Sequence, residues 1–291
     1  MTWSDVFSFE DYGELLQLMI NPLIAAIALG VVGGLVGVFV MQRDMAFAVH
    51  GISELSFAGA ALALLLGGSV VAGSLVGAVA AALVIGLLGT RARDRNSIVG
   101  VLMPFGLGLG ILFLSLYQGR SANRFSLLTG QIVAVTAPDL TWLIVISAVV
   151  LVGLVLVWNP LRFDSLDAAS AEARGLPVRG LSLVFMLLLG AIVAAAVHII
   201  GALLVMALLV TPAAAAMRVS HGPVGVPVLA AVFGLVSAAG GILLAIAGTL
   251  PVSPYITTIS FLIYLVCRLV AWRRDRVGRR RSGRAERIPA T

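Results

Sequence analysis

A succession of long apolar runs is the feature that most constrains what this chain can fold into. Each run has about 20 residues, which is enough to cross a bilayer as a helix. A segment in lipid must satisfy its own backbone hydrogen bonds, so helices are expected. The fold class is therefore all-α, a polytopic integral membrane protein with about nine transmembrane helices and a range of eight to ten. The runs cover residues 19–42, 45–66, 70–90, 97–117, 139–159, 180–197, 199–217, 224–247 and 255–272.

The composition agrees and excludes several activities. Charged residues make up only 11% of the chain, against about 25% in soluble domains. All 19 basic residues are arginine, so the lysine that a P-loop or a Schiff base requires is missing. The single cysteine, Cys267, excludes an intrachain disulfide and a thiolate metal cluster. We expect no enzyme activity of its own and no permanently bound cofactor.

The positions of the arginines predict the orientation in the plasma membrane. With nine spans, the arginines after runs one, three, five and seven fall on one side together with the basic end of the chain. Positive charge beside a span marks the cytoplasmic side. We therefore expect the N-terminus outside and the C-terminus in the cytoplasm. Residues 1–272 form one transmembrane domain, and residues 273–291 form a basic, disordered tail that contacts anionic lipid headgroups and no nucleic acid.

One carboxylate, Glu54, lies deep within an apolar run, and His50 precedes it by four positions. Residues i and i+4 share one face of a helix. A charged side chain in lipid costs at least ~2.5–3.5 kcal/mol, and such residues usually face a partner, water or an ion. Imidazole and carboxylate suit Zn²⁺ or Mn²⁺. We expect His50 and Glu54 to line a metal path; the open alternative is that both hydrogen-bond to neighbouring helices and serve packing.

The longest polar stretch between runs, residues 162–180, predicts a short cytoplasmic helix. Asp164 and Ser165 are good N-caps, and Gly175 is suited to end the helix. The intervening alanines and Glu172 favour helix. A short capped helix of this kind suits docking onto a partner protein, and a plain interfacial helix is the alternative.

Five segments together resemble one family, the zinc/manganese/iron ABC-importer permeases. Glu172-Ala173 followed by Gly175 looks like the coupling-helix motif by which such permeases engage their ATPase. The other four matches occur in the family's order and span most of the chain. They are Phe47–Ala63 (FAVHGISELSFAGAALA), Asp94–Gly100 (DRNSIVG), Phe125–Val135 (FSLLTGQIVAV) and Gly201–Ala216 (GALLVMALLVTPAAAA).

The resemblance implies the vitamin-B12-type ABC importer permease architecture and a role as the membrane subunit that imports a divalent transition metal, zinc or manganese. It implies a homodimer with a path at its axis, cytoplasmic ATPase subunits and an extracytoplasmic metal-binding protein. Ser165, Glu172, Ala173 and Gly175 would couple the chain to the ATPase. The family's usual Asp-xxx-His pair appears here in swapped order as His50-xxx-Glu54.

Three other functions stay open on the sequence. A related permease class carries iron–siderophore or cobalamin-type chelates, whose bulk makes a paired ligand site in the membrane unnecessary. A proton-coupled secondary carrier would use Glu54 as its proton site and needs no coupling helix. An intramembrane metalloenzyme would need a third protein ligand for a catalytic zinc.

Overall fold

The membrane-crossing helices dominate the fold. The computed structural model describes residues 12–89, 92–119, 127, 130, 132, 135–202, 204–248 and 252–285. Over these ranges eight helices are long and apolar enough to cross a membrane. They are α3 (Ile20–Gln42), α4 (Ala46–Leu65), α5 (Val70–Leu88), α6 (Ala92–Leu116), α8 (Ala137–Leu166), α10 (Val178–Ile200), α13 (Gly225–Ala247) and α14 (Val252–Ala285).

The seventh predicted span is not one helix. The run 199–217 contains the end of α10, a break, α11 (Val205–Leu209) and α12 (Thr211–Val219). Gly201 adopts φ +83°, which ends α10, and Pro212 occupies the first turn of α12, where its missing N–H is tolerated. The run predicted as one span is therefore divided into two short helices, and the eight long helices lie within the predicted range of eight to ten.

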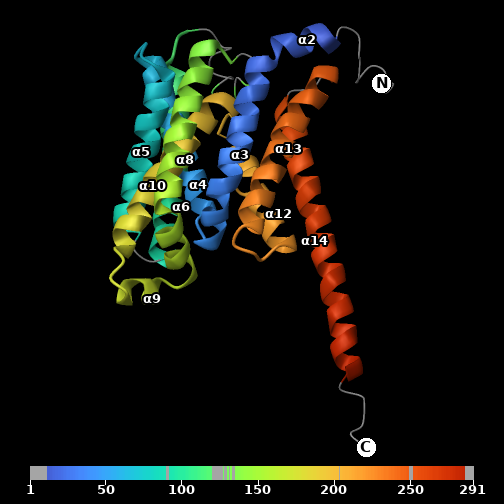
Figure 1. Ribbon diagram of the computed structural model, residues 1–291. Helices are drawn as coiled ribbons and strands as arrows, with labels where there is room; N and C mark the ends of the chain where they lie inside the picture. Colours follow the sequence, from blue (N-terminus) through green and yellow to red (C-terminus); the bar gives the residue numbers. More distant parts are fainter. Residues whose placement is uncertain are drawn as a thin grey trace, which may run out of the picture.

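The helices run up and down between two ends of a bundle (Figure 1). The short helix α2 (Tyr12–Leu18) lies at one end. The short helix α9 (Ala168–Ala173) and the C-terminal part of α14 lie at the other. The ends of α3, α8 and α12 and the start of α10 gather at the α9 end, so the arginines at these helix ends share one side, as the charge pattern predicts.

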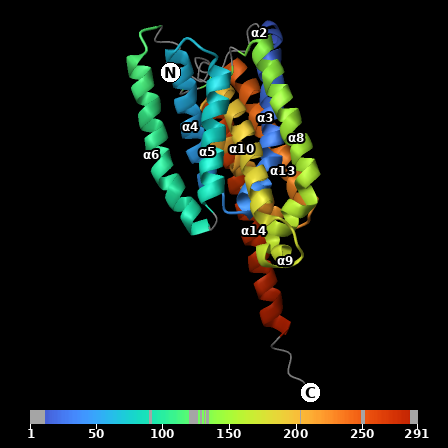
Figure 2. The same cartoon turned by 90° about the vertical axis from the view of Figure 1, so that its left-hand side faces the viewer.

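Helix α14 extends well beyond the bundle at the α9 end (Figures 1 and 2). It continues as far as Ala285, so residues 273–285 are helical where the sequence predicted a disordered tail. Within this helix the Arg276 guanidinium stacks 3.7 Å from the centre of the Trp272 ring, and Arg274 donates a hydrogen bond to the carbonyl of Val219. The division of the chain at residue 272 stays a prediction.

Three helices form the centre of the bundle. In the most apolar 18-residue stretch of α3, α4 and α10, 61–67% of the residues are buried. In the corresponding stretches of α6, α8 and α14 the share is 17–22%. Glycine permits the closest contacts: a Cβ on Gly30 of α3 would lie 2.5 Å from the carbonyl oxygen of Gly234 of α13. Small residues let membrane helices pack by close backbone approach. The helix with the predicted metal ligands, α4, is therefore a central one.

Candidate metal path and coupling helix

The structure brings the two predicted metal ligands together on α4. His50 Nε2 lies 3.8 Å from Glu54 Oε1, a separation too long for a hydrogen bond. Glu54 Oε2 and His50 Nδ1 are buried and have no hydrogen-bond partner among the described residues. The interhelical hydrogen bonds expected if the pair only stabilised packing are thus not seen for these two atoms.

The two residues of the pair differ in burial, since Glu54 lies in the interior of the chain and His50 reaches its surface. Glu54 is only 4% exposed, whereas the His50 side chain is 30% exposed. Phe47, three residues before His50 and on the same helix face, is 48% exposed. At 1.5 Å per residue, Glu54 lies ~12 Å along α4 from Ala46. The carboxylate is therefore deep in the membrane domain, with the imidazole between it and the outer edge of the single chain.

A single chain supplies too few ligands for a closed site at this point. No group of three or more His, Cys, Asp or Glu side chains that could hold a metal occurs within the part of the chain that the structure describes. Structural zinc sites usually have four protein ligands and catalytic ones three. The arrangement of His50 and Glu54 therefore suits passing contact with an ion, or completion by other groups, better than permanent binding by one copy.

Glycines place α4 between two other helices at the level of the pair. A Cβ on Gly106 of α6 would lie 3.0 Å from the Glu54 carbonyl carbon. A Cβ on Gly77 of α5 would lie 2.2 Å from the Leu55 carbonyl oxygen. Both backbones thus approach α4 more closely than any side chain would allow. These contacts fix the position of α4 on two sides, at residues adjacent to the predicted ligands.

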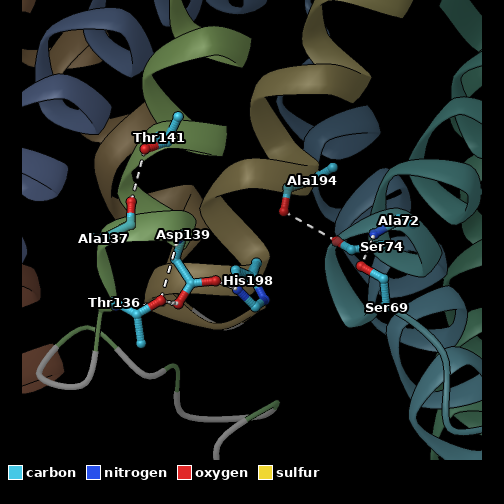
Figure 3. A network of polar contacts seen from close by, with 9 residues as sticks. All are labelled: Ser69, Ala72, Ser74, Thr136, Ala137, Asp139, Thr141, Ala194 and His198. Carbon is cyan, nitrogen blue, oxygen red and sulfur yellow. Dashed lines mark hydrogen bonds and ion pairs between the residues drawn. The ribbon is translucent and has the colours of Figure 1, made fainter.

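Buried serines connect α4 to its neighbours. Ser56 Oγ lies 2.7 Å from Ser74 Oγ of α5, and Ser74 Oγ donates to the Ala194 carbonyl of α10 at 3.1 Å (Figure 3 shows the second bond). Ser53 Oγ lies 3.4 Å from the carbonyl oxygen of Ala202, to which it donates. Ala202 is in the break between α10 and α11. Irregular backbone at membrane depth occurs where it is buried in protein or lines a water-filled cavity, so this break is positioned beside the residue preceding Glu54.

A second polar contact joins α8 and α10 at the end of the bundle away from α9 (Figure 3). Asp139 and Thr136 form a capping box at the start of α8. Asp139 Oδ1 also lies 3.2 Å from His198 Nε2 in the last turn of α10. His198 Nε2 is thus partnered. The segment Phe125–Val135, which precedes α8 and resembles a segment of the permease family, lies largely outside the described residues.

The coupling residues fall on and beside α9. Asp167, not Asp164 or Ser165, is the N-cap of α9: its side chain accepts hydrogen bonds from the backbone N–H of Ser170 at 3.1 Å and from its hydroxyl. These bonds, chiefly that from the Ser170 hydroxyl, lower the pKa of Asp167 below its ordinary value. The predicted caps are wrong because α8 continues to Leu166.

The tip of the helix is open to a partner. Glu172 and Ala173 are exposed, whereas Ala171 is fully buried against the bundle. Gly175 adopts φ +80°, and its N–H donates to the Glu172 carbonyl at 2.9 Å, which ends the helix. Figure 1 shows α9 projecting beyond the neighbouring helix ends. The structure thus presents the predicted coupling residues at the surface, and their role in coupling stays a prediction.

A buried ion pair beside α9 was missed by sequence reasoning. Arg43, at the end of α3, pairs with Asp164 in the last turn of α8; their side chains are 9% and 1% exposed. Arg43 also donates to Ser182 Oγ of α10 at 3.1 Å, and its carbonyl accepts a bond from Arg95 of α6 at 2.8 Å. Ser165 lies at the edge of this cluster, 3.5 Å from Arg43 Nη1. Arg43 therefore joins four helices at the base of α9.

These features define a class: a multi-pass helical membrane protein with a polar pair within the membrane and an exposed helix at one end. The model of the ABC 3 transport family matches residues 15–271, and the chain belongs to this family. The resemblance and the fold class predicted from the sequence are confirmed. The chain is a membrane permease of the ABC transporter type.

Known relatives cover most of the chain. The "Manganese transport system membrane protein MntC" of Halalkalibacterium halodurans is 30% identical over 223 residues, which is 76% of either chain. The "High-affinity zinc uptake system membrane protein ZnuB" of Buchnera aphidicola is 25% identical over 257 residues, 88% of this chain and 98% of the relative. Among solved structures, PsaBC from Streptococcus pneumoniae in complex with Fab is similar at a TM-score of 0.80 and 26% identity, covering 89% of this chain and 95% of the other.

Proposed function

We propose that this chain is the permease subunit through which a divalent transition metal ion, manganese or zinc, enters the cell. An extracytoplasmic binding protein delivers the ion, and a separate ATPase supplies the energy. Relatives named for manganese and zinc transport support the substrate class. The observation that carries the proposal in this chain is the His50–Glu54 pair, which combines N and O ligands with unsatisfied buried atoms inside the membrane domain.

The pair binds the ion in passage. A conduction site must bind strongly enough to replace water and weakly enough to release the ion. Two ligands from one chain bind weakly enough to release the ion. A second copy related by a two-fold axis supplies the same two ligands again, and the four together bind strongly enough to replace water. The exposure of Phe47 and His50 at the edge of the chain is consistent with such a homodimer axis.

Coupling follows the contacts at the base of α9. The ATPase binds the exposed tip at Glu172 and Ala173. Displacement of α9 moves Asp164 and Ser165 in the last turn of α8, and Arg43 carries that movement to the turn between α3 and α4. His50 lies one turn into α4 from that turn. A rigid-body shift of α4 then changes the access of the metal ion to His50 and Glu54, as expected of a packed two-state element.

The α9 end is cytoplasmic in this proposal. The ATPase must reach α9, and arginines gather at the same end. The C-terminal part of α14 then lies in the cytoplasm and α2 lies outside, in the plasma membrane. The His198–Asp139 contact lies at the outer end, where the binding protein docks.

The experiment measures uptake of manganese and zinc by proteoliposomes that contain the chain, its ATPase and its binding protein. Glu54→Gln and His50→Ala should each lower ATP-dependent uptake at least about tenfold, since each removes one of the two ligands per chain. Copurification with the ATPase should not change. Glu14→Gln, at an exposed acid of α2, is the matched control and should transport normally. Normal uptake by both site variants would refute the assignment of the pair.

The chelate permease that the sequence left open is not favoured by the relatives, which are named for manganese and zinc transport. The same proteoliposomes distinguish it, because uptake of a ferric chelate that survives Glu54→Gln would favour a bulky substrate. Uptake driven by a proton gradient without ATP would instead identify a secondary carrier.

A further inference from the structure

We propose that the cavity at the base of α9 binds a phosphate group, with a membrane phospholipid of the cytoplasmic leaflet as its source. The cavity has a volume of about 530 Å³ and lies among the ends of α3, α5 and α8 and the starts of α6 and α10. Its charged lining consists of Arg43, Arg95, Arg179 and Asp164. This site is separate from the metal path, and it does not depend on which substrate the permease carries.

The lining carries an excess of positive charge. Three guanidinium groups face one carboxylate, and Asp164 is already paired with Arg43. The charges of Arg95 and Arg179 are then left without a carboxylate in the lining. Asp44 also acts on Arg95, but it is exposed to water in the turn between α3 and α4. An anion in the cavity would balance this excess.

Buried donors in this lining are unsatisfied. Nε of Arg43 and Nε of Arg95 have no hydrogen-bond partner among the residues the structure describes. Arg95 is only 8% exposed, and the Arg43 side chain is 9% exposed. A buried donor without a partner costs free energy, and more when it is charged. Phosphate has several acceptor oxygens and pairs well with guanidinium groups, so it suits a lining that contains both of these arginines.

Apolar residues of the lining favour a lipid as the source. Leu87 at the end of α5 is 61% exposed, and Leu183 of α10 also lines the cavity. A free phosphate ion is not stabilised by apolar contacts, whereas the acyl chains of a phospholipid are. The cavity is lined by residues at the ends of membrane-spanning helices, which is the level at which lipid headgroups meet a membrane protein. Charge and apolar lining together point to an anionic phospholipid.

The test compares thermal unfolding of the purified full-length chain in vesicles of phosphatidylcholine alone and in vesicles containing phosphatidylglycerol. Anything that binds only the folded state raises its stability. The anionic lipid should raise the unfolding temperature of the wild type. Arg179→Gln, at an exposed residue of the lining, should bind it about tenfold more weakly and lose most of that rise, because a charge-assisted bond is lost. Arg95→Gln should do the same.

Arg174→Gln is the matched control, since Arg174 is an exposed arginine beside α9 that does not line the cavity. It should keep the full response. If inorganic phosphate in phosphatidylcholine vesicles gives the same protection, and Arg179→Gln removes it, the phosphate site stands and the lipid source is wrong. Equal responses of wild type and Arg179→Gln to every anion overturn the proposal. Protection by the ATPase subunit alone, lost in Arg179→Gln, would assign the cavity to an acidic partner residue and also overturn it.

Discussion

Removing Asp164 should destabilise the chain strongly, because it leaves the Arg43 guanidinium buried and unpaired. Both side chains are at least nine-tenths buried. Breaking a buried ion pair by removing one partner costs about 3–5 kcal/mol. Arg43 keeps its bond to Ser182 and borders a cavity, so the lower half of this range is expected. At roughly 2 °C per kcal/mol for a chain of this size, Asp164→Leu should lower the unfolding temperature by about 6–8 °C.

The double variant Arg43→Leu with Asp164→Leu separates the ion pair from the packing around it. Replacing both charges by apolar groups of similar volume is often close to neutral. The double variant should therefore recover most of the stability that the single variant loses, which a double-mutant cycle in detergent or vesicles measures. Arg218→Leu, at an exposed arginine on the same side, should change the unfolding temperature little.

The same double variant tests the route of coupling. It should fold and copurify with the ATPase, yet ATP hydrolysis should no longer drive uptake, because the polar link between the end of α8 and the end of α3 is removed. A single variant Asp164→Leu that is as stable as the wild type would refute the account of the ion pair. A double variant that couples normally would refute the route.

Further predictions concern packing, the coupling helix and its surface. Gly30→Ala should destabilise by about 1–3 kcal/mol, because the new Cβ would meet a backbone carbonyl at 2.5 Å, whereas Gly100→Ala in α6, with nothing within 4 Å, should be neutral or stabilising. The lowered pKa of Asp167 means that its cap on α9 is fully present above the unfolded-state pKa and is lost as pH falls through the folded value. The protection factors of the amides in residues 168–173, which are corrected for the intrinsic rate, should therefore fall at acid pH in the wild type and change less in Asp167→Ala. Glu172→Arg should leave thermal unfolding unchanged and weaken copurification with the ATPase, and equal copurification would contradict the docking assignment.

Much of the architecture could be predicted from the sequence because the membrane permits few solutions. Eight of the apolar runs are helices, since in lipid the backbone can satisfy itself in no other local way. The division of the run 199–217 into two short helices was not predicted, because mean hydropathy does not register the backbone conformation of Gly201 or the position of Pro212. Both residues are visible in the sequence, but packing around the break decides that α10 ends there.

The candidate site, too, could be predicted only in part from the sequence. The shared face of His50 and Glu54 follows from their spacing, and the 3.8 Å separation confirms their proximity. Their role as ligands stays a prediction. The caps assigned to Asp164 and Ser165 failed because the partner of Asp164, Arg43, is 121 residues away. Local propensity carries no information about such a partner, so α8 runs through a sequence that reads locally as a helix start.

The most direct test of the metal path is to locate the ion itself. Anomalous X-ray scattering from zinc or manganese, in crystals of the chain with its ATPase, should place a metal between His50 and Glu54. For zinc, the distances to an imidazole nitrogen and a carboxylate oxygen should be about 2.0–2.2 Å. A metal at this position, absent in Glu54→Gln, is what the account predicts. A transport-competent complex whose metal lies elsewhere in the membrane domain, with the pair unoccupied, would contradict it.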